Sequence, residues 1–146
     1  MINLDYDLSK FHEAQENSYQ RVLEEMKAGR KRTHWIWYIF PQLRSLGKSR
    51  IATYYGLENL AEAKAYLADE ILRSRLIEVS QAVLDVPSEN ITYIMGSRID
   101  VTKLCSSMTL FLLADPTCEV FKKVLDKYFD GKLDEKTVNL CNDDKI

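Results

Sequence analysis

The segment 29–38 combines cations, a histidine and both tryptophans of the chain within ten residues. Arg30 and Lys31 are followed closely by Trp35 and Trp37. Aromatic faces beside fixed cations suit a planar anionic ligand such as a nucleotide, through stacking and charge-assisted hydrogen bonds. The alternative is structural: favourable cations at a helix C-terminus, followed by a core segment whose indole N–H groups find backbone partners.

His34 lies inside this segment and is a candidate for proton transfer, because an imidazole ordinarily titrates near neutral pH. The spacing of the sequence identifies no carboxylate that would orient the ring. A lone histidine beside two tryptophans is more often a structural residue, and catalysis by His34 is the alternative.

A second candidate site lies at Gly47, Lys48 and Ser49, just before an expected helix. Gly-Lys-Ser before a helix is found in the phosphate loops of nucleoside triphosphatases, but Gln42 stands here where that loop has its earlier glycine. No alternating strand–helix pattern follows, which argues against such a fold. Free backbone N–H groups at the start of the helix predict a simpler anion site, which needs only Gly47 and Ser49. Gln42 is a candidate for hydrogen bonds with polar groups of a ligand.

A third candidate is the polar start of the apolar stretch 101–113. Lys103 and Ser107 are four residues apart and Ser106 is also within reach of the lysine on a helix. Lysine can act as a base toward serine in nucleophilic catalysis, so Lys103 is a candidate catalytic residue. In the structural alternative, which we favour over covalent catalysis, Lys103 pairs with Asp100 and the serines pack against a neighbouring helix; Ser106 and Ser107 remain candidate ligand contacts.

The residue types that can bind metals are not spaced as they are in metal sites. The three cysteines, Cys105, Cys118 and Cys141, and the two histidines are scattered, and the acidic residues are dispersed over helix faces. We therefore expect no metal and no cofactor. The odd number of widely spaced cysteines predicts reduced thiols in a cytosol, and the apolar surroundings of Cys105 predict a buried, inert side chain.

Composition narrows the classes of protein further. The chain has 146 residues, with 20 Lys and Arg against 22 Asp and Glu, so the formal charge is -2. This balance argues against a dedicated nucleic-acid binder, which neutralises many phosphates. No apolar run approaches the roughly 20 residues of a membrane helix, and residues 1–10 lack the features of a signal peptide. We expect a soluble, cytoplasmic protein that binds no membrane.

The elements that carry these residues are expected to be helices in one domain spanning residues 1–146. Only five glycines and three prolines punctuate the chain, which favours helices joined by short loops over a β-sandwich. The run 35–40 is continuously apolar and fits either a buried strand or a short helix, with Thr33 as a possible cap favouring helix. The sequence thus predicts an all-α fold of about eight helices.

Apolar spacing and capping residues give approximate bounds for these helices. The first is expected to place Phe11, Tyr19, Val22, Leu23 and Met26 on its apolar face, and a frayed tail is expected from Asn142. Expected helices cover 9–28, 50–55, 60–68, 71–84, 90–95, 101–113, 118–129 and a short stretch after Asp134, with Ser9, Ser49, Asn59, Asp100 and Thr117 as caps.

The combined motifs resemble a known family. They comprise Gly29-Arg30-Lys31, the run from His34 to Leu43 that contains His-Trp-Ile-Trp and Phe-Pro-Gln, Leu46-Gly47-Lys48-Ser49, Tyr55-Gly56, Lys103-Leu104 and Ser106 to Phe111. In this order they are similar to a bacterial family catalogued as domain of unknown function 1810, some of whose members carry the label calpastatin. The resemblance covers nearly the whole chain, and the run beginning at His34 is its most specific part.

The resemblance implies a mainly helical cytosolic domain and supplies no activity. Two positions depart from the family pattern: Ser45 replaces a frequent glycine, and Cys105 replaces a frequent arginine, which removes a cation near Lys103. The polar start and apolar second half of the stretch 101–113 are also similar in texture to small helical N-glycosidases that act on ADP-ribose-like compounds.

Two functions are compatible with these residues. The first is a pocket for a small anionic, nucleotide- or ribose-phosphate-like ligand, with hydrolysis as an extension in which His34 is the acid or base. The second is a non-enzymatic helical module for an unknown protein partner. A pocket requires the polar atoms of His34, Gln42 and Lys103 to converge on a concave surface, whereas a module requires an exposed apolar patch.

Overall fold

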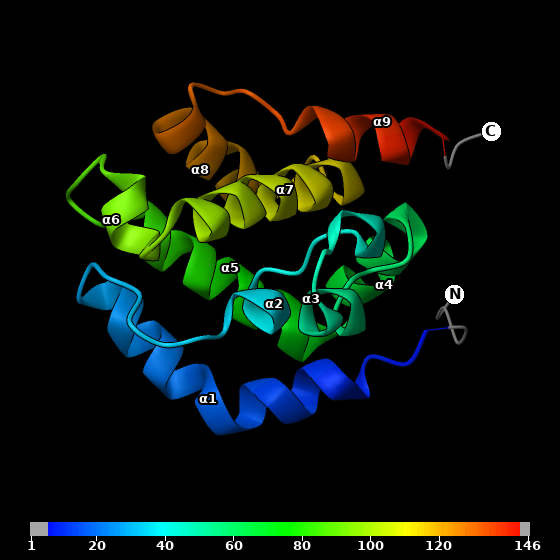
Figure 1. Ribbon diagram of the computed structural model, residues 1–146, viewed down its shortest axis with the longest axis horizontal. Coiled ribbons are helices and arrows are strands. Elements are labelled where there is room, and N and C mark those ends of the chain that lie inside the picture. The colour runs from blue at the N-terminus through cyan, green and yellow to red at the C-terminus, as the bar shows by residue number, and fades with distance from the viewer. Residues whose placement is uncertain (1–5, 144–146) are drawn as a thin grey trace.

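The computed structural model describes residues 6–143, which form nine α-helices, one short 3₁₀ helix and no strand. Helices α1, α5 and α7 form successive layers, with α8 and α9 beyond α7 and the short α2 and α3 on the near face (Figure 1). Within that part of the chain, no helix is both long enough and apolar enough to cross a membrane. The prediction of an all-α fold is confirmed.

The helices agree closely with the sequence periodicity. Their bounds are α1 Ser9–Lys27, α2 Ile36–Ile39, the 3₁₀ helix η1 Arg44–Leu46, α3 Arg50–Tyr54, α4 Leu60–Ala68, α5 Glu70–Leu84, α6 Ile91–Met95, α7 Arg98–Ala114, α8 Glu119–Phe129 and α9 Glu135–Asp143. The run 35–40 contains a single helical turn, α2. Helix α9 includes Asn142 and Asp143, and the rest of the expected frayed tail, residues 144–146, lies outside the described residues.

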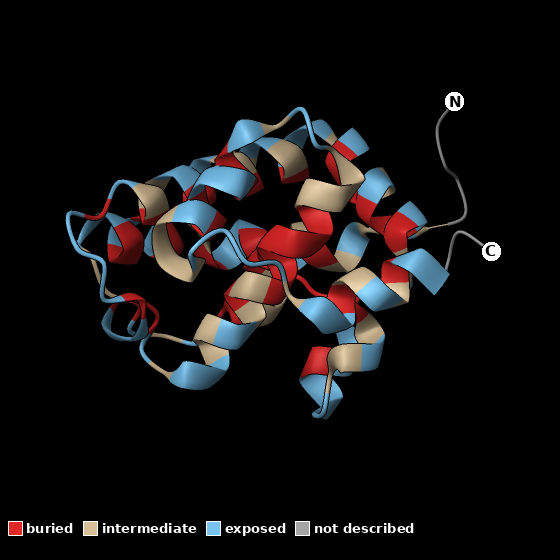
Figure 2. Ribbon diagram, turned by 90° about the horizontal axis from the view of Figure 1, so that it is seen from above, coloured by how far each residue is buried: buried red, intermediate tan, exposed pale blue. Residues whose placement is uncertain are grey.

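Helices α1, α4, α5, α7 and α8 enclose the core, and buried side chains gather at the centre of the molecule (Figure 2). Helix α7 contacts α4, α6, α8 and α9, while α5 lies between α1 and α8. The expected apolar face of α1 is buried except at Tyr19, which is half-buried. Phe111 of α7 packs against Tyr66 of α4 and Phe121 of α8. Helix α7 is thus surrounded by other helices, which explains the apolarity of its second half.

Some expected caps are confirmed. Ser49 accepts a hydrogen bond from the N–H of Ala52, and Asn59 accepts one from the N–H of Glu62. Helix α5 is capped by Asp69, which was not among the caps expected from the sequence.

Four other expected caps are wrong, because a nearby polar group takes up each side chain. Ser9 donates to Asp7, Thr33 donates to Glu25, and Thr117 donates to Asp115. Asp100 lies inside the first turn of α7, whose cap is Ser97.

The chain between α2 and α4 folds back on itself through a close backbone approach. The N–H of Arg44 donates to the carbonyl of Leu57, and the N–H of Leu57 donates to the carbonyl of Gln42. A Cβ at Gly56 would lie only 2.4 Å from the Cα of Arg44, so the approach requires glycine at that position. This pairing fixes Gln42 and the short α3 beside α2.

Candidate functional site

Helix α7 presents Asp100, Lys103 and Ser107 on one face, since residues three and four apart are neighbours on a helix. Asp100 reaches Lys31, which lies in the loop after α1, with 2.9 Å between Nζ and Oδ2. Lys103 reaches Trp37 in α2, with its Nζ 5.7 Å from the ring centroid. The same face of α7 therefore holds the loop 28–35 and α2.

Lys31 is buried and its charge is neutralised within the protein. Only 5% of its side chain is exposed. Besides the ion pair, its ammonium donates to the carbonyl of Thr33 at 2.6 Å and lies 4.9 Å from the centre of the Trp35 ring. The expected pairing of Asp100 with Lys103 is wrong, because Asp100 faces Lys31 instead.

A second buried charge, the carboxylate of Glu25 in α1, holds the same loop from the other side. It accepts hydrogen bonds from the N–H of Arg32 at 2.8 Å, the hydroxyl of Thr33 at 2.6 Å and the indole N–H of Trp35 at 2.9 Å. Burial raises the pKa of Glu25, but the hydrogen bonds from the Thr33 hydroxyl, the Arg32 N–H, the Trp35 indole and the Thr33 N–H outweigh it. They hold the pKa at about 2, below its ordinary 4.5.

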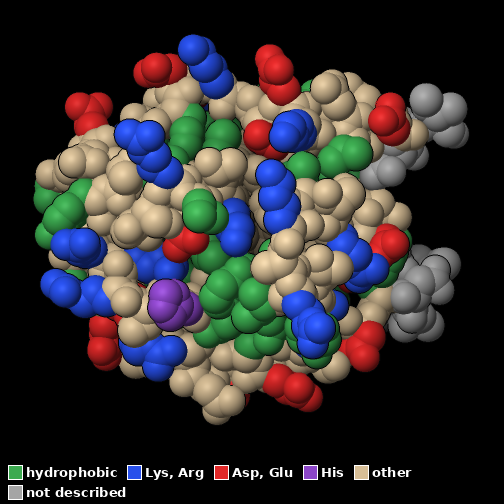
Figure 3. Space-filling model, in the orientation of Figure 1, with side chains coloured by type: hydrophobic (Ala, Val, Ile, Leu, Met, Phe, Trp, Pro, Cys, Tyr) green, Lys and Arg blue, Asp and Glu red, His purple; other side chains and the backbone are tan. Residues whose placement is uncertain are grey.

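The loop 28–35 and α2 leave three candidate side chains at the surface: His34, Trp37 and Lys103. The His34 ring is exposed and lies 6.5 Å from the Trp37 ring, with 33° between the planes. Trp37 and Lys103 are half-buried. Figure 3 shows a hydrophobic patch on this face with a histidine at its edge and Lys and Arg side chains around it.

The remaining cations and serines of the expected site are mostly engaged elsewhere. The Arg30 guanidinium stacks on Tyr93 of α6, with 4.4 Å to the ring centroid. The buried Ser106 donates to Asp134 at 3.2 Å, on the side of α7 that faces α9. Ser107 is fully buried, and its hydroxyl has no hydrogen-bond partner among the described residues.

Gln42 is buried, and its side chain makes no hydrogen bond within residues 6–143. Gly47 ends η1, Lys48 is exposed, and the Ser49 hydroxyl is occupied in capping α3. The structure thus brings His34, Trp37 and Lys103 together, and it assigns Lys31 and Trp35 to the buried support beneath them.

Cys105 differs from expectation in being half-buried, with its thiol 3.9 Å from the carbonyl oxygen of Lys132. Burial and the charge of Asp134 raise the pKa of this thiol to about 11 although a hydrogen bond with Thr109 lowers it. Among residues 6–143, no group of three or more His, Cys, Asp or Glu side chains is placed to hold a metal ion.

Glu25 was not among the site residues expected from the sequence. A signal was present, because Ser18, Val22 and Glu25 follow one another at helical spacing on the buried face of α1. An acidic residue on an apolar face predicts a buried hydrogen-bonded charge. Its partners were not predictable, since the loop that supplies them has no regular pattern.

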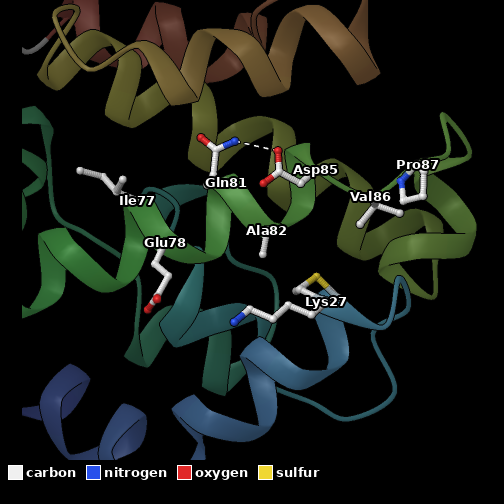
Figure 4. A pocket seen from close by; sticks show the side chains of 9 residues that line it. Lys27, Ile77, Glu78, Gln81, Ala82, Asp85, Val86 and Pro87 are labelled. Carbon is white, nitrogen blue, oxygen red and sulfur yellow. Dashed lines mark hydrogen bonds between the residues drawn. The ribbon is translucent and has the colours of Figure 1, made fainter.

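A groove of about 470 Å³ lies between the end of α1 and the second half of α5. Its lining includes the buried Met26 and the exposed Glu78 and Asp85, and Gln81 donates a hydrogen bond to Asp85 (Figure 4). None of the residues expected from sequence to bind a ligand lines this groove.

Comparison with known proteins places the chain in a family. Residues 5–141 match the family model DUF1810, described as a protein of unknown function. The chain belongs to this family. The DUF1810 chain also resembles the crystal structure of the conserved hypothetical protein Rv1873 from Mycobacterium tuberculosis, with 46% identity and a TM-score of 0.91, over 94% of this chain and 97% of that one. No curated protein compared with it matches.

Proposed function

We propose that this DUF1810 protein binds a small anionic, nucleotide- or ribose-phosphate-like ligand at the surface formed by His34, Trp37 and Lys103. The observation that carries the proposal is the position of Lys103. Its ammonium lies over the Trp37 ring and makes no ion pair with a carboxylate of residues 6–143.

Lys103 is available for a ligand because Asp100, three residues earlier, is already held by Lys31. The ammonium keeps N–H donors for an anion, and a half-buried setting makes a charge-assisted hydrogen bond stronger than it is in open solvent. The partly exposed face of Trp37 adds a surface on which a planar group can stack.

The surroundings of Lys103 favour a fixed site over a mobile surface lysine. Trp37 follows directly on a loop held by two buried charges, Glu25 and Lys31, so the ring has a defined position before a ligand arrives. Preorganisation of this kind lowers the entropy lost on binding. Gln42 is a buried amide whose side chain makes no hydrogen bond within the described chain, and it is our candidate to bind a neutral polar group of the ligand.

We further propose that the protein hydrolyses the bound ligand, with His34 as the acid or base and Lys103 stabilising negative charge. No carboxylate of the described residues contacts the His34 ring, so the imidazole would work without an orienting partner. Turnover is therefore a separate readout from binding: His34→Ala should abolish turnover and weaken binding less than Lys103→Ala does.

The test is a thermal-shift screen of the purified protein against nucleotides, sugar phosphates and ADP-ribose derivatives. A ligand at 100 times its dissociation constant stabilises the fold by about 2.7 kcal/mol, which is a visible shift for a domain of this size. We expect a dose-dependent shift that Lys103→Ala removes and that Lys123→Ala, an exposed lysine on α8, leaves unchanged. A hit that is equally strong in Lys103→Ala would refute the site.

A protein-interaction module is the second candidate, and a different surface favours it. Ile99 is 67% exposed and Tyr93 is 52% exposed, at the turn between α6 and α7, with Arg30 stacked on Tyr93. Exposed apolar side chains, one of them stacked against a cation, are typical of a surface that meets an acidic partner. Under this alternative, Ile99→Ser should weaken capture of the partner while ligand-induced thermal shifts are absent from the wild type.

A further inference from the structure

A second candidate surface lies beside α3. It is a broad, open hollow of about 620 Å³, lined by Ser49, Arg50, Ile51, Tyr54 and Tyr55. Ile51 is 39% exposed and Tyr54 is 56% exposed, so apolar side chains face solvent there. None of His34, Trp37 and Lys103 lines the hollow, so its occupant is independent of the ligand under the proposed function.

Aromatic rings form the apolar wall of the hollow. Tyr54 and Tyr55 lie edge to face, with 4.8 Å between their ring centroids. The Tyr55 ring also packs against Phe11 of α1 at 5.7 Å and against Tyr38 of α2 at 5.4 Å. Rings that are held in this way can receive an apolar side chain with little loss of conformational entropy.

The backbone that carries these rings is fixed on both sides. The hydroxyl of Ser49 caps α3 at the N–H of Ala52, and the N–H of Arg44 donates to the carbonyl of Leu57 after α3. A Cβ at Gly47 would lie 3.0 Å from the carbonyl carbon of Ala52, so the end of η1 packs closely against α3. The hollow therefore has its shape before a partner arrives.

Two cations accompany the rings. The ammonium of Lys10 donates to the carbonyl of Tyr54 at 2.6 Å and lies 4.9 Å from the centre of its ring. Arg50 lines the hollow and is exposed. Neither cation forms an ion pair with a carboxylate of residues 6–143. Both therefore keep N–H donors for a carboxylate from outside the chain.

The carboxylates of the surrounding chain do not compensate this charge within the hollow, since none of the described ones lines it. Asp7 interacts electrostatically with Lys10, and Glu13 with Tyr55. Asp7 already accepts hydrogen bonds from the N–H and the hydroxyl of Ser9. An apolar hollow whose own charges are cations is complementary to an apolar side chain flanked by carboxylates.

We infer that this hollow docks an acidic peptide segment of a partner protein. An aromatic side chain of the segment lies against Tyr54 and Ile51, and its carboxylates meet Lys10 and Arg50. Aromatic anchors supply much of the binding energy of such contacts, while charges at the rim orient the segment. The surface is small, so one segment binds weakly and exchanges quickly, as transient partners do.

The test is an NMR titration of the ¹⁵N-labelled protein with three acetylated and amidated pentapeptides. Each has phenylalanine at its centre, and the other four positions are all glutamate, all glutamine or all lysine. We expect the glutamate peptide to shift the backbone amides of Ile51, Tyr54 and Tyr55. It should bind about fivefold more tightly than the glutamine peptide, as two exposed charge pairs predict. The lysine peptide should bind more weakly than either.

Variants separate the charges from the rings. Arg50→Gln should lower the preference for glutamate, and adding Lys10→Gln should abolish it. Tyr54→Ser should weaken the glutamate and glutamine peptides alike, because it removes the wall that both use. The matched controls are Lys123→Gln, at an exposed lysine of α8, and Tyr93→Ser, at an exposed tyrosine of α6, and they should change nothing.

No shift with the glutamate peptide, or equal affinity for the glutamate and glutamine peptides, would overturn the inference. Shifts centred on Tyr93 and Ile99 would overturn it in favour of that surface. Phenylacetate binding as tightly as the glutamate peptide would show that the occupant is a small carboxylate and not a peptide. Lys103→Ala should leave peptide binding unchanged, so failure of this inference and failure of the proposed function are distinguishable.

Discussion

Replacing Glu25 with glutamine should remove the negative charge that holds the loop 28–35, while keeping the shape of the side chain. Glutamine retains one carbonyl oxygen, which can still accept from the N–H groups of Arg32 and Trp35. The Thr33 hydroxyl can rotate to accept from the new amide. The main change is therefore from charge-assisted to neutral hydrogen bonds.

The magnitude follows from the pKa of Glu25, which is about 2 in the folded protein against an ordinary 4.5. Because the folded pKa is depressed, the ionised carboxylate stabilises the fold fully above pH 4.5, and this stabilisation is lost as the pH falls toward 2. The difference corresponds to about 3 kcal/mol at neutral pH and to about half of that at pH 3.

Urea denaturation of the wild type and Glu25→Gln, at pH 7 and again at pH 3, measures this effect. We expect the variant to be less stable by about 3 kcal/mol at pH 7 and the gap to shrink by about half at pH 3. Glu24→Gln, an exposed neighbour in the same helix, should change stability little at either pH. A gap that does not depend on pH would refute the reasoning, because the effect would then not come from the carboxylate charge.

Three further predictions concern the surrounding structure. Lys31→Met should lower the free energy of unfolding, measured by urea denaturation, by about 3 kcal/mol, because it leaves the Asp100 carboxylate without its partner. Adding Asp100→Asn should restore part of this loss, and equal stability of the single and double variants would contradict the prediction. Gly56→Ala should cost about 2 kcal/mol or more, since its Cβ would meet a backbone atom at 2.4 Å; an unchanged melting temperature would show that the backbone relaxes. The pKa of the Cys105 thiol is about 11 against an ordinary 9.0, so this thiol should react with iodoacetamide about 100-fold more slowly than an unperturbed thiol at pH 7.5. Peptide mass spectrometry follows the reaction, and a rate near that of free cysteine would argue against burial of the thiol.

The helical architecture was predictable because it is encoded locally. The buried positions of α5 repeat at three- and four-residue steps, and Leu72, Leu76, Val79 and Val83 are all buried as that spacing predicts. Ser49 and Asn59 cap their helices as expected, since an N-cap needs only the side chain and N–H groups a few residues later. The family resemblance was equally readable, because its motifs are contiguous.

The caps that failed did so because their side chains had competitors. Thr33 and Asp100 are both good capping residues, yet each is engaged by a charged group from another part of the chain, Glu25 and Lys31 respectively. The local preference of a residue for the N-cap position predicts poorly where a buried charge needs a partner. Leaving such a charge unpaired costs more free energy than a cap contributes.

The sequence by itself determined that this chain folds as helices and that cations and aromatic residues are concentrated near Trp37. Only the tertiary structure decided which of those residues face solvent. Lys31 and Lys103 look alike in the sequence, but α7 offers one carboxylate on this face and Lys31 takes it, which leaves Lys103 over the Trp37 ring. The physical reason is that an ion pair between distant segments depends on how helices pack, and helix packing is a property of the whole chain.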